Sequence, residues 1–421
     1  MSNKGFLDKL AINGGEPVRT KKFPQYPLYD EEEIQAAERV LRSGKFSRLS
    51  GTETLNFELE FAAKIGVKHA IAINNGTAAI HVALFALGIG PGDEVINTSH
   101  CFIGTATPVA HGGAVPVFAD INPRTYNIDP LSIESKITSR TKAIVPVHLN
   151  GCPAEMDEIL DIANKYNLFV VEDAAQALLA LYKDRVVGTL GNVGCYSFWE
   201  DKLITTGGEG GMVITNDDEV ARLARMFQNH GEAAEEGEYY KGERLYLHEF
   251  LGWNYRLTEL QSAIGRVQLK KVDDYIDKRR RNAHQLTEML NEVDGIITPY
   301  EPEDIKHVFY KYIIRLDRKI LDIPSVDFVA ALMAEGIPCS RRYPTPLHQQ
   351  PVFVEKRGFG RTNAPFTPPW AKQDVSYGSG LLNSESLPND LVRLLMNPNL
   401  TMEELEDSVN AIKKIVNAYK K

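Results

Sequence analysis

Residues 74–79 (Asn-Asn-Gly-Thr-Ala-Ala) combine a glycine and a hydroxyl side chain at the point where a strand pattern changes to a helix pattern. Backbone amides at a helix N-terminus attract anions, and Thr77 would add a hydroxyl donor. Gly76 would let the backbone approach a ligand closely. The motif predicts a small anion site, although an ordinary strand-to-helix turn has the same sequence pattern.

Two further motifs contain groups that can move or hold a proton. Asp173 follows the apolar residues Val170 and Val171, at the carboxyl edge of an α/β sheet, where ligands bind. Lys202 lies between residues 196–201 and a glycine cluster at 207–211, which suggests backbone wrapped around a ligand. The alternatives are a helix-capping Asp and a solvated surface Lys.

The fourth motif, residues 252–256 (Gly-Trp-Asn-Tyr-Arg), precedes a long helix pattern. Asn254 and Arg256 carry donors suited to a phosphate or a carboxylate. The alternative is that these residues only cap the start of the helix.

The elements that must position these motifs alternate between short apolar strands and helices from about residue 30 to about residue 250. Continuous apolar strands with helices between them predict an α/β domain with a mostly parallel sheet covered on both faces. The expected strands are 70–73, 94–97, 115–119, 143–147, 168–171 and 211–214, and the expected helices are 78–87, 155–165 and 218–227.

After residue 250 the pattern becomes α+β. We expect a long helix at 257–288, a strand at 308–314, a helix at 326–335, a polar Pro/Gly-rich stretch at 344–388 and a final helix at 401–419. Thr401 and Glu404 have capping-box spacing at the start of that last helix. The charged segment 232–249 is expected to be a mobile loop. The predicted division is an N-terminal arm (1–29), a large domain (30–256) and a smaller C-terminal α+β domain (257–421).

Composition limits the class of protein. The chain of 421 residues has a net charge of −9, which argues against a general nucleic-acid binder. It has no apolar run long enough to cross a membrane and no h-region typical of a signal peptide. Four scattered cysteines predict neither a metal site nor a disulfide framework. We therefore expect a soluble cytoplasmic protein without a metal ion.

The order of the four motifs resembles that of fold-type I pyridoxal-phosphate (PLP) enzymes. More narrowly, the chain resembles the DegT/DnrJ/EryC1/StrS sugar aminotransferases. Further matching segments are 58–62, 88–95, 147–151 and 342–348.

The resemblance implies roles for four residues around the cofactor ring. Lys202 would form a Schiff base with PLP and later shuttle a proton, which requires a neutral amine. Asp173 would keep the pyridinium nitrogen protonated, so that the ring acts as an electron sink. Gln176 would lie near the 3-hydroxyl oxygen, and Phe102 would stack on the ring unless it is only a core residue.

The phosphate end of the cofactor is implied to meet Gly76, Thr77 and Ser197. Asn254 matches a family residue that reaches the phosphate from a neighbouring subunit, which implies a homodimer with shared active sites. Arg256 is a second candidate for that role or for helix capping.

On the substrate side, the resemblance points to Tyr343 and His348 near the entrance. The basic loop at residues 45–51 is expected to be flexible and to face substrate or the partner subunit. A surface loop and a structural proline-bounded turn are the alternatives.

Two features bear on the substrate class. Many family members have His-Gly shortly after the Asp173 motif, and this chain has Leu178 and Leu179 there, which would make one edge of the site apolar. Residues 10–19 resemble the opening of cyclitol and aminohydroxybenzoate-pathway members. Together they favour a keto-cyclitol or a related free ring over a nucleotide-linked sugar.

The resulting prediction is a PLP-dependent aminotransferase. It would move nitrogen from glutamate or glutamine to a keto sugar or keto-cyclitol in amino-sugar, secondary-metabolite or cell-surface polysaccharide biosynthesis. A PLP-dependent dehydratase or lyase on a related ring and a non-catalytic regulatory relative remain as alternatives, since a fold does not fix a function.

Overall fold

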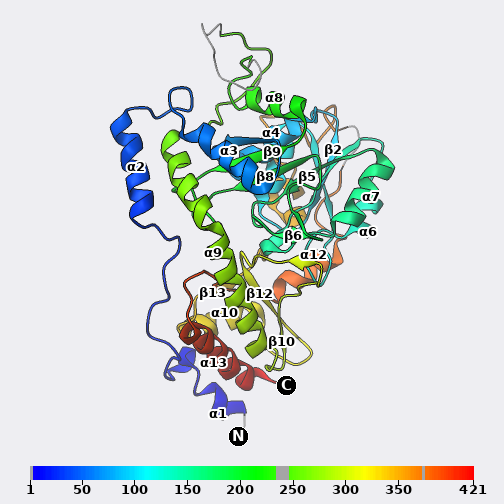
Figure 1. Cartoon of the computed structure of the whole chain (residues 1–421). Coiled ribbons are helices and arrows are strands. Elements are labelled where there is room, and N and C mark those ends of the chain that lie inside the picture. Colours follow the sequence, from blue (N-terminus) through cyan, green and yellow to red (C-terminus); the bar gives the residue numbers. More distant parts are fainter. Residues whose placement is uncertain (1–2, 234–245, 372–374) are drawn as a thin grey trace.

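The computed structural model describes residues 3–233, 246–371 and 375–421. Its large domain is built on a seven-stranded sheet of order β1-β9-β8-β5-β4-β2-β3 (Figure 1). Strand β9 runs antiparallel to β1 and β8, and the remaining neighbours pair in parallel. The mostly parallel α/β sheet is confirmed. Its strands are β1 (His69–Ile73), β2 (Glu94–Thr98), β3 (Val115–Ala119), β4 (Thr141–Val145), β5 (Phe169–Asp173), β8 (Val193–Ser197) and β9 (Gly211–Thr215).

Helices cover both faces of this sheet, because alternate strand residues point to opposite sides. Ile71 and Ile73 pack with α4, α5 and α8, whereas Ala70 and Ala72 pack in a second core with α3, α6, α7 and α9. A separate small contact joins α2 to α9. These helices are α2 (Glu31–Ser43), α3 (Glu53–Ile65), α4 (Gly76–Ala86), α5 (Thr107–His111), α6 (Pro130–Ser135), α7 (Met156–Tyr166), α8 (Asp218–Phe227) and α9 (Glu259–Leu290).

The C-terminal part is built on a four-stranded antiparallel sheet of order β10-β12-β14-β13. The second half of α9 and two further helices bury its apolar side. In Figure 1, α9 extends from the large domain down to this smaller unit. The elements are β10 (Ile296–Ile297), β12 (Tyr312–Leu316), α10 (Ser325–Ala334), β13 (Cys339–Arg341), β14 (Leu391–Leu394) and α13 (Met402–Tyr419).

The strand expected at 308–314 begins only at Tyr312. Phe309 has a left-handed backbone with φ 46°. The amides of Val308 and Lys311 donate to Gly151 and Asn150 of the large domain, at 3.0 and 3.2 Å. Residues 308–311 therefore join the two domains instead of extending the strand.

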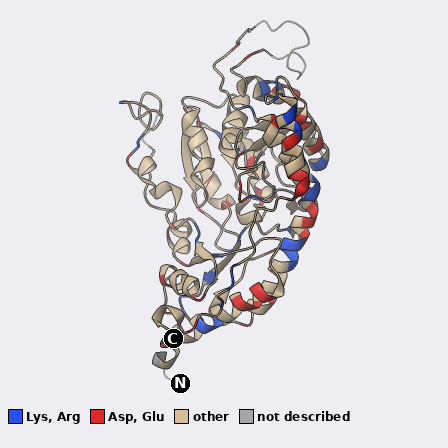
Figure 2. Cartoon of the chain, turned by 90° about the vertical axis from the view of Figure 1, so that its left-hand side faces the viewer, with Lys and Arg blue, Asp and Glu red and all other residues tan. Residues whose placement is uncertain are grey.

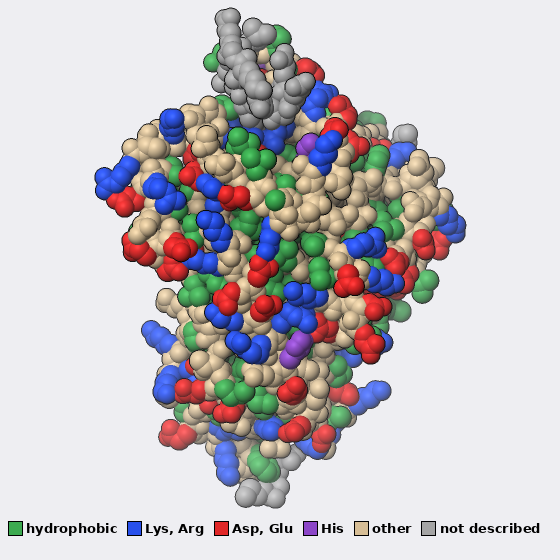
Figure 3. Space-filling view, viewed as in Figure 1, with side chains coloured by type: hydrophobic (Ala, Val, Ile, Leu, Met, Phe, Trp, Pro, Cys, Tyr) green, Lys and Arg blue, Asp and Glu red, His purple; other side chains and the backbone are tan. Residues whose placement is uncertain are grey.

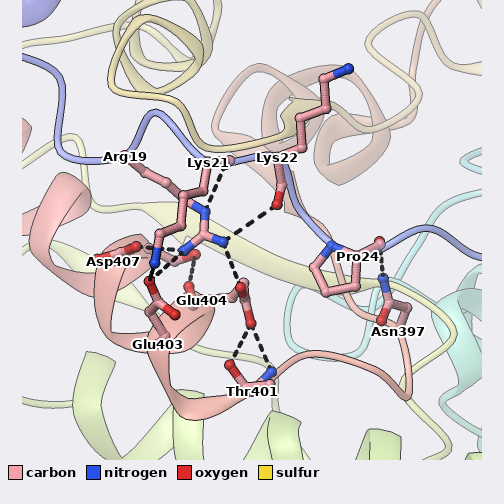
Figure 4. Close-up of polar contacts among 10 residues, drawn as sticks. Arg19, Lys21, Lys22, Pro24, Asn397, Thr401, Glu403, Glu404 and Asp407 are labelled. Carbon is pink, nitrogen blue, oxygen red and sulfur yellow. Dashed lines mark hydrogen bonds and ion pairs between the residues drawn. The ribbon is translucent and has the colours of Figure 1, made fainter.

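The N-terminal arm, which includes α1 (Asn3–Leu7), is anchored to the C-terminal domain. Leu10 lies in the core of that domain. Arg19 forms ion pairs with Glu404 at 2.5 Å and Asp407 at 2.7 Å on α13 (Figure 4). Glu404 also accepts a hydrogen bond from the amide of Thr401 at 2.9 Å, and this confirms the capping box.

Part of the Pro/Gly-rich stretch packs on the large domain. Phe353 and Phe366 share a core with Phe118 of β3, and the Tyr377 hydroxyl donates to the carbonyl of Pro116 at 2.6 Å. The remaining short elements are α11 (Pro351–Val354), α12 (Leu382–Ser386) and a three-stranded sheet of β6 (Leu181–Tyr182), β7 (Arg185–Val186) and β11 (Ile305–Lys306). The smaller unit is thus tied to the large domain along much of its length.

Charges of both signs are interleaved on the surface. Figure 2 shows acidic and basic segments alternating along the helices of one flank, and the face in Figure 3 mixes red, blue and green side chains. None of the helices in the described residues is both long and apolar enough to cross a membrane. Most of the charged segment expected to be a loop at 232–249 lies outside the described residues.

Candidate cofactor and substrate site

Three strands of the large sheet bring the predicted motifs to one edge. Strands β1, β8 and β5 run in the same direction, with the antiparallel β9 between β1 and β8. These three strands end at Ile73, Ser197 and Asp173. The motif at 74–79 follows β1, and Lys202 follows β8. The carboxyl edge of the sheet is therefore the place where the candidate groups meet.

The start of α4 forms the predicted anion cup. Asn75 is the N-cap, and its side-chain oxygen accepts a hydrogen bond from the amide of Ala78 at 2.8 Å. Amides of the first helical turn, here those of Gly76 and Thr77, have no partner within the helix. A Cβ on Gly76 would lie 2.7 Å from Cβ of Ser197, so the glycine is required where these two segments meet. The motif therefore forms an ordinary strand-to-helix turn, and the same turn is compatible with an anion site.

Asp173 is a buried carboxylate held from two sides. Its Oδ2 accepts from the Thr105 hydroxyl at 2.6 Å, and its Oδ1 accepts from the amide of Ala175 at 3.1 Å. No helix begins after Asp173, because the next regular element is the two-residue strand β6. The helix-capping alternative is therefore wrong, and a fixed, buried carboxylate is left at the edge of the sheet.

Lys202 lies in the same region, only partly exposed, with Nζ 4.8 Å from the centre of the Tyr310 ring. Burial lowers the pKa of its amine from 10.5 to about 8. The Asp173 carboxylate opposes this shift, and the Arg342 guanidinium adds to it. The alternative of a fully solvated surface Lys does not fit this environment, and a fraction of the amine is neutral near pH 7.

Gln176 belongs to a network that the sequence did not reveal. Its Oε1 accepts from the amide of Asn150 at 2.9 Å and from Nη2 of Arg342 at 2.8 Å, and its Nε2 donates to the Tyr343 hydroxyl at 3.3 Å. His100 packs edge-on against the Tyr343 ring at 5.7 Å. Burial and the Arg342 charge lower the pKa of His100 to about 3, so this imidazole is neutral.

Phe102 lies beside the anion cup, and 58% of its side chain is exposed. A Cβ on Gly104 would lie 2.6 Å from the Thr77 hydroxyl and 2.9 Å from Cδ1 of Phe102. The aromatic ring is therefore next to Thr77 with an open face, and it is not a core residue. This position suits a ring that stacks on a ligand.

Asn254 is exposed in the single chain. The next residue, Tyr255, accepts at its carbonyl from the amide of Asn74 at 2.8 Å, so this segment borders the anion cup. Arg256 donates from Nη1 to Asn229 at 2.5 Å. The N-cap of α9 is Thr258, and the capping alternative for Arg256 is therefore wrong.

Three other expectations concerned the substrate side. His348 is buried rather than open, with Nε2 3.3 Å from the Glu385 carboxylate. Leu178 and Leu179 lie in the core of the large domain, so they do not form an open apolar edge. The loop at 45–51 is held to the protein, because Arg48 forms a buried ion pair with Glu58 and the Phe46 carbonyl accepts from the start of α9 at 3.1 Å.

The arrangement fits PLP. The first-turn amides of α4, which have no partner within the helix, lie next to Ser197 and suit a phosphate. The buried Asp173 suits a protonated ring nitrogen, and Lys202 has an amine that is partly neutral. Among the described residues, no group of three or more His, Cys, Asp or Glu side chains could hold a metal ion. The fold is that of a fold-type I PLP enzyme, and the residues of the candidate site are compatible with that cofactor.

The chain belongs to the DegT/DnrJ/EryC1/StrS aminotransferase family, whose profile matches residues 27–381. It is 42% identical over 305 residues to GDP-perosamine synthase of Caulobacter vibrioides, covering 72% of this chain and 79% of that one. It is 37% identical over 354 residues to a putative L-glutamine:3-amino-2,3-dideoxy-scyllo-inosose aminotransferase of Streptoalloteichus tenebrarius, covering 82% and 83%.

A solved structure of NtdA from Bacillus subtilis, which contains pyridoxamine phosphate, matches with a TM-score of 0.79 and 29% identity over 94% of this chain and 86% of that one. The protein is therefore a PLP-dependent aminotransferase of the sugar aminotransferase family. The predicted family, activity and cofactor are confirmed.

Proposed function

We propose that this enzyme transfers an amino group from glutamate or glutamine to the ring ketone of a keto sugar or keto-cyclitol. The pathway would be amino-sugar, secondary-metabolite or cell-surface polysaccharide biosynthesis. The observation that carries the proposal is the Lys202 amine, whose pKa is lowered to about 8, in the same buried region as the Asp173 carboxylate. The relatives that match act, by their names, on a sugar nucleotide or on a cyclitol.

The role proposed for each residue is the one that the family resemblance implies, and the surroundings of each residue are compatible with it. PLP, when bound, supplies the electron sink. Lys202 removes and returns the proton at the substrate carbon that exchanges nitrogen, and about 10% of this amine is neutral at pH 7, against roughly 0.03% for an ordinary lysine. Asp173 would balance the positive charge of the ring nitrogen, and Gln176 would lie near the 3-hydroxyl oxygen. The amides of Gly76 and Thr77, with the Ser197 hydroxyl, would hold the phosphate.

The working unit in this proposal is a homodimer, with Asn254 reaching the partner's phosphate site. Two exposed apolar side chains just before Asn254 in the chain support it, since Leu251 is 93% exposed and Trp253 is 51% exposed in the single chain. Leu251→Asp should give monomers in sedimentation and weaken PLP binding. A wild-type protein that is monomeric and fully active would contradict the shared site.

Absorption spectroscopy tests the transfer chemistry. The cofactor-free protein should gain a visible band when PLP is added, and Lys202→Ala should lack it. The matched control Lys142→Ala, at an exposed lysine, should behave like wild type. Glutamate or glutamine should then bleach the band, and a keto acceptor should restore it. A band that responds to neither donor would favour a lyase, and no band at all would favour a regulatory protein.

For the acceptor, we propose a keto-cyclitol or a related free ring. Support comes from residues 10–19, which resemble cyclitol-pathway proteins, and from the 37% identical relative named for a scyllo-inosose. Because Leu178 and Leu179 are buried in the core, they no longer add to this argument. A screen of the aminated enzyme should show conversion of free keto-cyclitols. Conversion of nucleotide-linked 4-keto sugars alone would overturn the choice.

A further inference from the structure

Residues 201–206, which include Lys202, form a loop without regular helix or strand. Two glycines follow it, and Gly207 and Gly208 have φ of 86° and 136°, which side chains other than hydrogen disfavour. A cavity of about 510 Å³ lies against one side of the loop, with Asp201 in its wall. Close packing therefore does not fix the loop on that side, and its position there depends on hydrogen bonds.

The Tyr26 hydroxyl of the N-terminal arm supplies such a hydrogen bond. It lies 2.7 Å from the carbonyl oxygen of Lys202 and 2.8 Å from that of Leu203, and its single proton can be shared between them. Burial raises the pKa of Tyr26, so the hydroxyl keeps its proton and acts as the donor. Tyr26 also lines the cavity beside the loop. A residue of the arm therefore holds the two peptide groups that follow Lys202.

A buried arginine fixes the ring of Tyr26. Arg279 of α9 is only 1% exposed, and its guanidinium carbon lies 4.6 Å from the centre of the ring. Its Nη1 donates to the carbonyl of Met396 at 2.5 Å, which sets the place of the guanidinium. A cation over an aromatic face attracts the ring, most strongly where water is excluded. Arg279 therefore keeps Tyr26 in the orientation in which its hydroxyl meets the loop.

The backbone of the arm is held on both sides of Tyr26. Asn397 donates from Nδ2 to the carbonyl of Pro24 at 3.2 Å (Figure 4), and Gln268 donates from Nε2 to the carbonyl of Leu28 at 3.0 Å. Both side-chain amides are buried, so water does not compete well for these hydrogen bonds. Tyr26 is thus attached to α9 and to the smaller domain, and its hydroxyl extends that attachment to the loop.

The role proposed for Lys202 requires an accurate position. Its amine would take the proton from the substrate carbon that exchanges nitrogen and deliver it to the C4′ carbon of the cofactor, so it must reach two atoms in turn. Misplacement by about 1 Å can slow such a step about 100-fold. The neighbouring Asp201 is held separately, because its carboxylate accepts from Nζ of the buried Lys311. What the Tyr26 hydroxyl adds is support for the backbone after Lys202.

We propose that Tyr26 is a positioning residue, which holds the loop so that the Lys202 amine reaches both carbons. The inference rests on the proposed function, because proton transfer by Lys202 is part of it. Tyr26→Phe removes the hydroxyl and keeps the ring beside Arg279, so the arm and the fold are retained. The variant should be slower in proton transfer, with little change in binding, because Tyr26 is not assigned to PLP or to the donor.

Single-turnover kinetics separate these effects. The donors are glutamate and glutamine, each with hydrogen or deuterium on the α-carbon, and bleaching of the visible band is followed. In Tyr26→Phe the rate should decrease roughly 10-fold, since the hydroxyl is one of several supports of the loop. The apparent Kd values of donor and PLP should change less than about threefold. Deuterium should slow the variant more than wild type, because proton transfer then limits the half-reaction more strongly.

Hydrogen exchange tests the same contact in the cofactor-free protein. The amides of Lys202 and Thr206 donate within the loop, to the carbonyls of Trp199 and Phe198 at 2.9 and 3.2 Å. Without the Tyr26 hydroxyl these hydrogen bonds should open more often, and exchange should be roughly 5- to 10-fold faster. Peptides from α7, on the other side of the domain core, should exchange as in wild type.

Tyr377 provides a matched control. Its hydroxyl also donates to a backbone carbonyl, that of Pro116 at 2.6 Å, and it packs in a separate core with Phe353. Tyr377→Phe therefore loses a hydrogen bond of the same kind. It should keep the wild-type rate, the wild-type isotope effect and the wild-type exchange of residues 201–206.

Two results would overturn the proposal. One is a wild-type rate and isotope effect in Tyr26→Phe, and the other is unchanged exchange of the loop. A slower reaction that comes only with weaker binding of PLP or donor would also decide against it, and would make Tyr26 a support of the binding site. If wild type forms the visible band and responds to neither donor, the proposed function fails instead. Faster exchange in Tyr26→Phe would then still assign Tyr26 to holding the loop.

Discussion

The amine of Lys202 is expected to lower the stability of the cofactor-free protein, and Lys202→Met isolates that cost. Methionine has a chain of similar length and no charge, so it keeps most of the packing against Tyr310 while removing the amine. In the wild-type protein, folding transfers an ammonium group from water to a site where burial disfavours its charged form. We expect Lys202→Met to be the more stable protein at neutral pH.

The pKa of Lys202 sets the size and the sign of this effect. A decrease from 10.5 to about 8 means that folding opposes protonation, and the full cost applies below pH 8. That cost is about 3 kcal/mol as an upper limit, and partial exposure of the side chain reduces it to roughly 1–3 kcal/mol. As the pH rises from 8 to 10.5 the cost disappears, because the amine then becomes neutral in the unfolded chain as well. By pH 10, at most about 1 kcal/mol remains.

Urea unfolding at equal protein concentration measures the difference. Cofactor-free wild type, Lys202→Met and the exposed control Lys142→Met should be compared at pH 7 and pH 10. Lys202→Met should gain stability at pH 7 and lose most of that gain at pH 10, whereas Lys142→Met should follow wild type. A Lys202→Met protein that is less stable at pH 7, or equally stabilised at both pH values, would refute the reasoning.

Three further outcomes follow from the site and its support. Gly76→Ala places a methyl group 2.7 Å from Cβ of Ser197, so PLP affinity in a fluorescence titration should decrease at least 10-fold. An unchanged affinity would mean that the phosphate does not bind at the start of α4. Asp173→Asn should still bind PLP but slow the donor half-reaction by about two orders of magnitude in stopped-flow absorbance, whereas a wild-type rate would remove Asp173 from the mechanism. Glu172→Gln disturbs a buried carboxylate that accepts from the amides of Gly188, Leu190 and Gly191 at 2.6–2.7 Å, and should cost about 2–4 kcal/mol in urea unfolding. A cost below about 1 kcal/mol would contradict that role.

The sequence predicted six of the seven strands of the large sheet, because each of those six is a short apolar run, and it did not predict β8 (Val193–Ser197). Expected and observed bounds differ by one residue for β2 (94–97 against Glu94–Thr98) and for β9 (211–214 against Gly211–Thr215). Such runs are buried on both faces, so hydrophobicity alone locates them. The C-terminal domain was harder, since β13 and β14 have three and four residues and follow or precede polar segments.

The strand at 308–314 shows why local pattern was insufficient there. The sequence predicts a strand from residue 308 because Val308 and Phe309 are apolar. In the structure their backbone contacts the loop around Asn150, more than 150 residues earlier in the chain. Hydrogen bonding between domains therefore outweighs local strand preference, and a single sequence contains no signal for such a contact.

The candidate site likewise has one part that local sequence motifs predict and another that depends on contacts between residues far apart in the chain. Gly76, Asp173, Ser197 and Lys202 lie within recognisable local motifs, and the structure brings them to one sheet edge. The contacts of Arg342 with Asn150 and Gln176 span 192 and 166 residues, so neither spacing nor periodicity could reveal them. The one signal in the sequence was that Arg342 is the first residue of segment 342–348, which resembles the family.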